Sequence, residues 1–366
     1  MTIYCANPAA QFFKCQNEIE LAVLKVLRSG QYILGNEVDA FENEFAEYLD
    51  VKYAIGVANG TDAIEIAIRA LDIKPGDEII TVSHTAVATV AAIESAGALP
   101  VLVDVDPIFY TLDPSKLNSA LSPRTRAVIA VHLYGQPADL EAISNFCKLN
   151  DIYLIEDCSQ AHGAKWKNKF LGTVGHLGCF SCYPTKNLGA FGDAGIIVSN
   201  DKKLAEKVKL LRQYGWQERN ISNIPGRNSR LDEIQAAILR VKLKYLNSNN
   251  LMRREIAGEY SKSLANLPLN LPNSRLNCEE VFHLYVIRFD NREKLRTHLE
   301  KYGIQTGIHY PMPIHMQPAY KSRIKVSGQM ETSEKIASEI LSLPMYPELL
   351  PNELSKVIKT INTFFY

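Results

Sequence analysis

Seven short apolar runs, separated by segments with helical periodicity, follow one another between about residues 54 and 200. The runs are AIGVA, DEIITVS, LPVLVDVD, TRAVIAVHLYG, IYLIED, GCFSCYP and GIIVS. Most are apolar at nearly every position, which is typical of strands that are covered on both faces of a mostly parallel sheet. Strands and helices in repeated succession predict an α/β fold with a mixed, mostly parallel, seven-stranded sheet. Ligands of such sheets bind at the carboxyl ends of the strands.

The pattern changes after about residue 247, where strands and helices no longer alternate. A helix is expected at 247–264, a strand at 281–289 and a final helix at 350–365. We therefore predict an N-terminal arm and large domain over residues 1–246, followed by a smaller α+β domain over residues 247–366. The last helix of the large domain is expected to begin near Ser229, with Ser229 and Asp232 as its capping pair.

Charge and hydropathy exclude several classes of protein. The chain has 40 basic and 40 acidic side chains, so no net charge attracts it to nucleic acid or to an anionic membrane. No apolar run reaches membrane-spanning length and no signal-peptide core is present, so a cytoplasmic enzyme is expected. Seven scattered cysteines do not resemble a disulfide framework. Cys179 and Cys182 lie three positions apart in an expected strand and face opposite sides, which argues against a zinc site.

Polar residues suited to a phosphate and to a charged ring follow two of the expected strands. Asn59, Gly60 and Thr61 join a strand to an apolar helix, whose N-terminal N–H groups and dipole favour a bound phosphate. Glu156 and Asp157 end the run IYLIED, where a buried carboxylate needs a partner such as a pyridinium N–H. Each junction taken alone also fits an ordinary capped turn.

A lysine in an unusual setting follows the run GCFSCYP. Lys186 lies in a loop rich in glycine, and only Lys186 and Asp193 are charged at neutral pH between residues 177 and 200. A lysine in an apolar site has a lowered pKa and can form a Schiff base, although most lysines are solvated surface residues. Ser181, just upstream, can donate to a phosphate. A second anion-site candidate, or an ordinary polar loop, is formed by Arg227, Asn228 and Arg230.

Together these motifs resemble the sugar aminotransferases of the DegT/DnrJ/EryC1/StrS family, which have the type I fold of pyridoxal-phosphate enzymes. The resemblance runs from GQYILGNEVDAFENEFAEYL to HYPMPIH. Its most specific parts are GVANGTDAIEIAIRAL, IEDCSQAHGA, YPTKNLGAFGDAG and NSRLDEIQAAIL, four motifs in the order and at the spacing of the family. The resemblance implies pyridoxal 5'-phosphate as the cofactor and favours the functional interpretation of each motif.

The resemblance also implies a role for each motif residue. Lys186 matches the lysine that carries the cofactor, and Asp157 matches the carboxylate that pairs with the pyridine nitrogen. The other cofactor contacts that it implies are Gly60, Thr61 and Ser181 around the phosphate, Gln160 beside the ring hydroxyl, His84 on the ring face, and Asn228 from the partner subunit. Its substrate-site candidates are Tyr183, His309, Tyr310, Tyr32, Arg219 and His315. No metal is expected, because no third ligand accompanies His309 and His315.

The family resemblance implies that the chain moves the amino group of L-glutamate to a nucleotide-linked keto-deoxysugar, in a homodimer with shared active sites. The stretch SHTAVATVAAIESAGALPVLVDVD is closest to enzymes that aminate C3 of a dTDP-3-keto-6-deoxyhexose, giving a dTDP-3-amino-3,6-dideoxyhexose. Amination at C4 of a nucleotide 4-keto-sugar stays open, because those enzymes share the four motifs. A sugar dehydratase would have histidine in place of Lys186. A regulatory protein that binds the cofactor without turnover is the alternative from another class, which the complete catalytic set disfavours.

Overall fold

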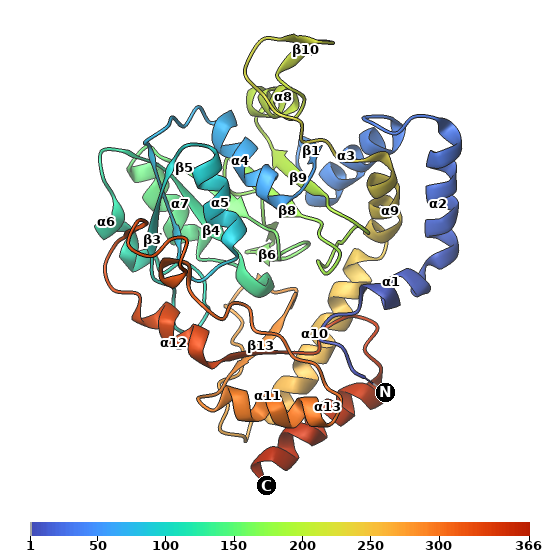
Figure 1. Ribbon diagram of the computed structural model, residues 1–366, viewed down its shortest axis with the longest axis vertical. Coiled ribbons are helices and arrows are strands. Elements are labelled where there is room, and N and C mark those ends of the chain that lie inside the picture. The colour runs from blue at the N-terminus through green and yellow to red at the C-terminus, as the bar shows by residue number, and fades with distance from the viewer. Residues whose placement is uncertain (1) are drawn as a thin grey trace.

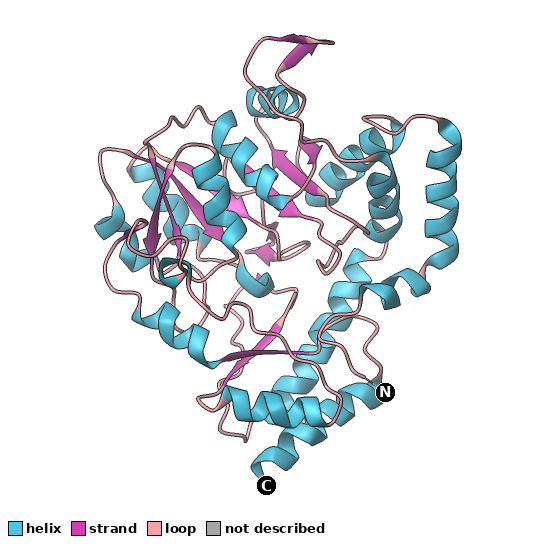
Figure 2. Ribbon diagram, in the orientation of Figure 1, coloured by secondary structure: helices cyan, strands magenta, loops and turns pink. Residues whose placement is uncertain are grey.

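The computed structural model describes residues 2–366, which form a large sheet layered with helices and a smaller sheet beside it (Figures 1 and 2). The strands of the large sheet are β1 (Tyr53–Val57), β2 (Glu78–Val82), β3 (Leu99–Val103), β4 (Thr125–Val131), β5 (Tyr153–Asp157), β8 (Leu177–Ser181), β9 (Gly195–Ser199) and β14 (Lys325–Val326). The helices around it are α3 (Asn36–Leu49), α4 (Gly60–Ala70), α5 (Val87–Ser95), α6 (Leu117–Ala120), α7 (Leu140–Leu149), α8 (Lys202–Leu211) and α9 (Glu233–Leu243).

The large sheet has the strand order β1-β9-β8-β5-β4-β2-β3-β14. Strand β9 runs antiparallel to its neighbours β1 and β8, and every other neighbouring pair is parallel. The seven expected strands all lie in this sheet, which confirms the mixed, mostly parallel fold. The eighth strand, β14, comes from the C-terminal part of the chain and pairs with β3.

Helices cover both faces of the large sheet, which explains why its strands are apolar at most positions. In Figure 1, α4 and α5 lie in front of the sheet and α7 lies behind it. Helix α4 packs on β8 and β9, whereas α7 packs on β4 and β5. Every residue of β2 and β9 is buried, as expected for strands without a solvated face. This layering brings the carboxyl ends of the parallel strands to one edge, where the polar residues of the motifs gather.

A second apolar core lies in the C-terminal part of the chain. It is built on the antiparallel pair β13 (Tyr285–Arg288) and β15 (Ile340–Leu343) together with α10 (Leu246–Leu264), α11 (Arg292–Lys301) and α13 (Pro351–Phe365). The N-terminal residue Ile3 packs in this core, whereas Ile314, Tyr320 and Met330 pack on residues of α5 and β3. A domain boundary after residue 246 therefore remains a proposal.

The other elements are short or lie at the surface. They are α1 (Pro8–Lys14), α2 (Gln16–Ser29), α12 (Glu331–Glu339), β6 (Lys165–Trp166), β7 (Lys169–Phe170), β10 (Trp216–Glu218), β11 (Ile221–Ser222) and β12 (Cys278–Glu279). The β10–β11 hairpin projects from the top of the molecule in Figure 1. Among residues 2–366, no helix has both the length and the apolar character needed to cross a bilayer.

The capping pair expected at Ser229 and Asp232 does not form, so this prediction is wrong. Helix α9 begins at Glu233, and its N-cap residue Asp232 makes no side-chain capping hydrogen bond. The Ser229 hydroxyl instead accepts a hydrogen bond from the backbone N–H of Ala58, at 3.1 Å. The polar residues before α9 are therefore used for tertiary contacts and not for local capping.

Candidate active site

A cavity of about 830 Å³ lies at the carboxyl ends of β4, β5 and β8. The loops after β1 and β2 supply further parts of its wall, and residues of the smaller domain and of the N-terminal arm close it from the other side. The predicted residues that line this cavity are Gly60, Thr61, Asp157, Gln160, Ser181, Tyr183, Lys186, His309 and Tyr310. The fold therefore brings Gly60 and Tyr310, which are 250 positions apart in the sequence, to the same cavity.

The start of α4 forms a site suited to a phosphate group. Asn59 is the N-cap residue of α4, and its side chain accepts a hydrogen bond from the N–H of Asp62 at 2.8 Å. A Cβ atom at Gly60 would lie 2.5 Å from the Cβ of Ser181, so only glycine lets the helix start this close to the end of β8. The N–H groups of the first helical turn and the hydroxyls of Thr61 and Ser181 then face one cavity, as phosphate binding requires.

Asp157 places a buried carboxylate at the end of β5. Its Oδ2 atom accepts a hydrogen bond from the Thr89 hydroxyl at 2.9 Å, and its Oδ1 atom accepts one from the N–H of Ser159 at 3.2 Å. Asp157 lines the cavity and is 5% exposed. A carboxylate held by two neutral donors has no cation of its own among these partners, so it suits a pyridinium N–H in the cavity.

The neighbouring Glu156 points to the other face of β5 and has a structural role. Its carboxylate accepts hydrogen bonds from the N–H groups of Gly172, Val174 and Gly175 at 2.7–2.8 Å. It also contacts Nε2 of His132 at 3.1 Å. Of the two carboxylates predicted at this strand end, only Asp157 reaches the cavity, because successive residues of a strand face opposite sides.

Lys186 lies in the loop after β8, where burial changes its acid–base chemistry. Burial lowers the pKa of the Lys186 amine to about 8, although the negative charge of Asp157 acts in the opposite direction. A larger fraction of this amine is therefore neutral near pH 7 than for an exposed lysine. Only the neutral amine has the lone pair that attacks a carbonyl carbon or takes a proton from carbon.

Gln160, in the loop after β5, meets Tyr310 from the C-terminal part of the chain in the cavity wall, which His309 also lines. The Gln160 amide donates to the hydroxyl oxygen of Tyr310 at 3.2 Å and accepts from the N–H of Tyr134 at 2.6 Å. Burial raises the pKa of Tyr310 to about 12, so its hydroxyl stays protonated. Burial and the charge of Lys186 lower the pKa of His309 to about 4, so its ring is neutral near pH 7. Both side chains are hydrogen-bonding groups without charge.

His84 and His315 do not reach the cavity, in contrast to the prediction for both. His84 is fully buried and its Nε2 atom contacts the Tyr134 hydroxyl at 2.8 Å, whereas the next residues, Thr85 and Ala86, line the cavity. His315 is held by the Ser83 hydroxyl at 2.7 Å and by Glu334 at 3.0 Å. Each imidazole is turned towards polar partners inside the protein, which a position in the sequence cannot reveal.

Three further predicted residues lie at the surface and outside the cavity of their own chain. Tyr32 is 51% exposed in the loop before α3, Arg219 lies between β10 and β11, and Asn228 is exposed before α9. None of the three lines the cavity. Their predicted ligand contacts are therefore not made within one chain.

Residues that the sequence did not single out complete the site. Thr89 holds Asp157, Tyr134 positions Gln160 through its N–H, and His283 lines the cavity near Lys186. The only sequence signal was for Thr89, a polar residue in the apolar helix VATVAAIE. Tyr134 lies just after β4, and His283 lies in the C-terminal part of the chain. No local sequence pattern marks either of them as a site residue.

These features together define a class of protein. One cavity at the carboxyl edge of a mostly parallel sheet contains three features. They are a lysine of lowered pKa, a buried carboxylate, and a helix N-terminus with a glycine and hydroxyl groups beside it. These features fit pyridoxal phosphate part by part. The close approach of Gly60 to Ser181 suits the phosphate, Asp157, which is held only by neutral donors, suits the ring nitrogen, and the buried Lys186 suits the aldehyde carbon. The fold and the site are those of a pyridoxal-phosphate-dependent aminotransferase.

Comparison with known proteins gives the family. Residues 14–362 match the DegT/DnrJ/EryC1/StrS aminotransferase family, and the chain belongs to this family. A dTDP-3-amino-3,6-dideoxy-alpha-D-galactopyranose transaminase of Aneurinibacillus thermoaerophilus is 46% identical over 351 residues, which are 96% of each chain.

Solved structures agree with this assignment. The X-ray structure of DesV from S. venezuelae has a TM-score of 0.97 and 40% identity, covering 99% of this chain and 98% of that chain. The structure of NtdA from Bacillus subtilis, with bound pyridoxamine phosphate as cofactor, has a TM-score of 0.89 and 32% identity, covering 95% and 81%. The fold of this chain is therefore that of the pyridoxal-phosphate aminotransferases, and its cofactor is pyridoxal phosphate.

Proposed function

We propose that the enzyme transfers the amino group of L-glutamate to C3 of a dTDP-linked 3-keto-6-deoxyhexose. The product is then a dTDP-3-amino-3,6-dideoxyhexose. The single observation that carries this proposal is the 46% identity, over 96% of both chains, to the A. thermoaerophilus transaminase that is named for such a product. The cavity of about 830 Å³ supports it, because it leaves room for a sugar ring beside the cofactor.

Two residues of the chain carry out the proton chemistry of this proposal. Bound pyridoxal phosphate accepts the amino group and withdraws electrons into its ring. The neutral form of the Lys186 amine, which is more populated because burial lowers its pKa to about 8, takes the proton from the α-carbon of the amino donor. Asp157 keeps a proton on the ring nitrogen, which maintains the electron withdrawal. The uncharged Tyr310 and His309 line the same cavity and are proposed to bind the sugar.

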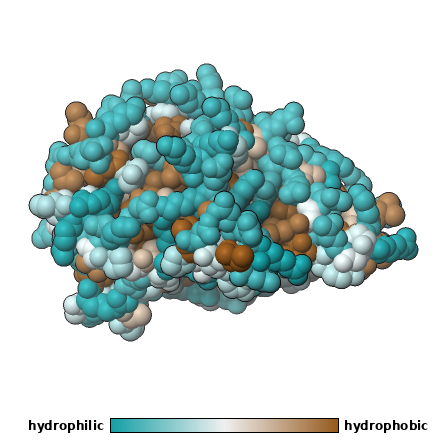
Figure 3. Space-filling model, turned by 90° about the horizontal axis from the view of Figure 1, so that it is seen from above, coloured by the Kyte–Doolittle hydropathy of each residue, from teal (hydrophilic) through white to brown (hydrophobic). Residues whose placement is uncertain are grey.

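We propose that the active enzyme is a homodimer with shared active sites. Tyr32, Arg219 and Asn228 match family positions that contact the ligands, yet they lie outside the cavity of their own chain. Large apolar side chains are exposed on α1 and α2, among them Phe13 at 68% and Leu21 at 69%. Figure 3 shows apolar patches between polar ones on one face of the molecule. A second copy of the chain would cover the exposed apolar side chains and supply the three residues.

The alternatives make different predictions. Amination at C4 of a nucleotide 4-keto-sugar uses the same catalytic residues and differs only in how the sugar lies in the cavity. A regulatory protein without turnover would bind the cofactor through Lys186, but glutamate would not convert that cofactor to pyridoxamine phosphate. The reaction belongs in the cytoplasm by this proposal, which agrees with the seven free cysteines.

An amination assay tests the proposed function. The enzyme with pyridoxal phosphate and glutamate is given dTDP-3-keto- and dTDP-4-keto-6-deoxyhexoses and their UDP counterparts, and each product is analysed by NMR. We expect the new amine at C3 of the dTDP sugar. An amine at C4 would replace the C3 proposal by the C4 alternative. If glutamate does not convert the bound cofactor to pyridoxamine phosphate, the assignment of glutamate as amino donor is wrong.

A further inference from the structure

A chain of side-chain amides connects the residue after Lys186 to His283, in the wall of the cavity. The Asn250 amide donates to the backbone carbonyl of His162 at 2.8 Å. The Asn187 amide donates to the side-chain oxygen of Asn250 at 2.9 Å and to the backbone carbonyl of Val281 at 3.0 Å. A backbone carbonyl can only accept, so these two carbonyls fix the orientation of both amides.

This orientation determines the tautomer of His283. The NH₂ group of Asn187 donates to Asn250 and Val281. The side-chain oxygen of Asn187 is therefore the atom that lies 3.2 Å from Nδ1 of His283. An amide oxygen has no hydrogen, so Nδ1 of His283 must carry the proton of this hydrogen bond. In a neutral imidazole the other nitrogen, Nε2, is then an acceptor with a free lone pair.

Burial keeps the imidazole of His283 neutral. It lowers the pKa of His283 well below its ordinary value, and the positive charges of Lys186 and Arg253 act in the same direction, as do His309 and His162. His283 is 6% exposed and lines the cavity, so its remaining exposed surface opens to the cavity. Among residues 2–366, no group donates a hydrogen bond to its Nε2 atom.

We propose that Nε2 of His283 accepts a hydrogen bond from an O–H or N–H group of a reactant in the cavity, which makes His283 a substrate-contact residue. The proposal rests on the proposed aminotransferase function and adds a contact to it. The donor is a hydroxyl of the sugar or the amine of the amino donor. An acceptor here complements Tyr310, whose protonated hydroxyl can donate from the same wall.

Two substitutions separate substrate contact from a structural role. In His283→Asn the amide lies where Nδ1 was, so the bond to Asn187 is kept and the acceptor at Nε2 is lost. In His283→Gln the amide oxygen reaches the position of Nε2, so the acceptor is kept and the bond to Asn187 is lost. We expect His283→Asn to reduce kcat/KM by about tenfold or more, as for one lost hydrogen bond, and His283→Gln to recover most of this loss. The reverse order would show a structural role and overturn the proposal.

The two half-reactions, measured separately in single turnovers, identify the donor group. A loss confined to the glutamate half assigns the amine of the amino donor, a loss confined to the sugar half assigns a sugar hydroxyl, and a loss in both assigns a contact to each reactant in turn. No loss in either overturns the proposal. If wild type converts glutamate but no keto-sugar, the proposed substrate is wrong, and the glutamate half still tests His283.

A spectroscopic measurement tests the tautomer without any turnover. The enzyme is labelled with ¹⁵N-histidine, and the signals of His283 are assigned by their loss in His283→Gln. We expect the chemical shifts of a neutral ring with the proton on Nδ1 at pH 7. In the Asn187→Ala variant, this preference should weaken because the acceptor for Nδ1–H is gone. A ring protonated on Nε2, or on both nitrogens, would overturn the proposal.

Discussion

The charge of Asp157 influences the acid–base chemistry of Lys186 in the cavity. Burial lowers the pKa of the lysine to about 8, and the negative charge of the aspartate limits this decrease. The lysine is thus neutral often enough to react near physiological pH, while the carboxylate remains available for the ring nitrogen of the cofactor. The Thr89 hydroxyl and the N–H of Ser159 hold this carboxylate without neutralising it.

The pH dependence of cofactor attachment follows from these charges. The rate at which apoenzyme attaches pyridoxal phosphate should rise with pH and level off above a midpoint near 8, because only neutral Lys186 reacts. In Asp157→Asn the midpoint should move to lower pH, because the charge that favours the ammonium form is gone. Stopped-flow absorbance at several pH values measures both midpoints. A midpoint near 10 in the wild type would contradict the effect of burial.

The same substitution also tests the role of Asp157 in the reaction. Asp157→Asn should keep the fold but reduce the rate of the glutamate half-reaction by about 100-fold or more, because an amide does not stabilise a protonated pyridine. Single-turnover absorbance of the bound cofactor measures the rate, and circular dichroism checks the fold. A half-reaction at the wild-type rate would remove Asp157 from this role.

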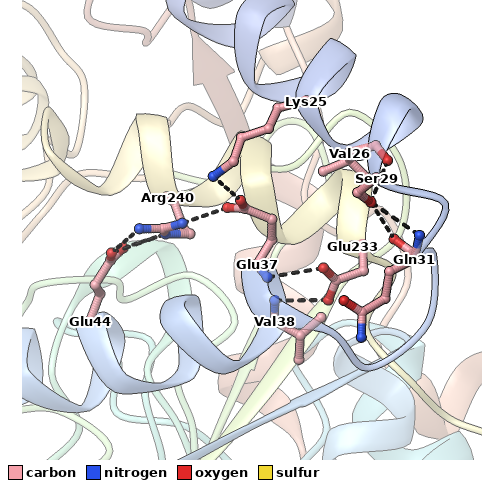
Figure 4. A network of polar contacts seen from close by, with 9 residues as sticks. All are labelled: Lys25, Val26, Ser29, Gln31, Glu37, Val38, Glu44, Glu233 and Arg240. Carbon is pink, nitrogen blue, oxygen red and sulfur yellow. Dashed lines mark hydrogen bonds and ion pairs between the residues drawn. The ribbon is translucent and has the colours of Figure 1, made fainter.

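At the scale of elements, one acidic residue of α9 completes the start of α3. Helix α3 has Gly35 as its N-cap, which offers no side chain to bind the first N–H groups. The Glu233 carboxylate accepts hydrogen bonds from the N–H groups of Glu37 and Val38 at 2.9 and 3.0 Å (Figure 4). It accepts a third from the N–H of Gly35 at 2.7 Å. This contact attaches the loop that contains Tyr32 to α9, the helix that follows Asn228.

Removal of this cap should destabilise the start of α3. Glu233→Ala leaves three buried N–H groups without a partner, and we expect a loss of about 2 kcal/mol or more in unfolding free energy. Hydrogen exchange of the Gly35, Glu37 and Val38 amides should accelerate strongly, and urea unfolding measures the loss. Glu44→Ala is the matched control: it removes a more exposed carboxylate that pairs with Arg240 in the same network, and should cost less than about 1 kcal/mol. Equal effects of both substitutions would contradict the capping role.

At the scale of the whole molecule, the chain carries residues that cannot serve its own cavity. Tyr32, Arg219 and Asn228 lie outside it, while apolar side chains of α1 and α2 are exposed. Twofold symmetry resolves both observations, because the same contact then supplies two equivalent sites. The oligomeric state is therefore part of the catalytic proposal.

Mixing two inactive variants tests the shared site. In a heterodimer of Lys186→Ala and Asn228→Asp subunits, an Asn228 that acts on the partner places both defects in one site and leaves the other site intact. Activity should then return to about half of wild type per heterodimer. If Asn228 acts within its own subunit, each site keeps one defect and no activity returns. A monomer in light scattering would contradict the dimer itself.

The sequence determined the chemistry and the local structure of this protein. Continuous apolar runs predicted all seven principal strands, because a strand covered on both faces has no polar positions. Lys186, Asp157, Gly60 and Ser181 were found because each depends on a short motif at a strand end. The family resemblance assigned the ring-nitrogen role to Asp157 and not to Glu156, and the alternation of strand residues in β5 gives the physical reason, because only Asp157 faces the cavity.

The tertiary structure decided which residues share the cavity. His84 was expected at the cofactor ring and His315 at the substrate, and both side chains bind other protein groups, Tyr134 for one and Ser83 with Glu334 for the other. The position of His283 depends on the packing of the smaller domain and on amides distant in sequence. Such contacts form between segments that meet only after folding, so no local pattern of residues specifies them.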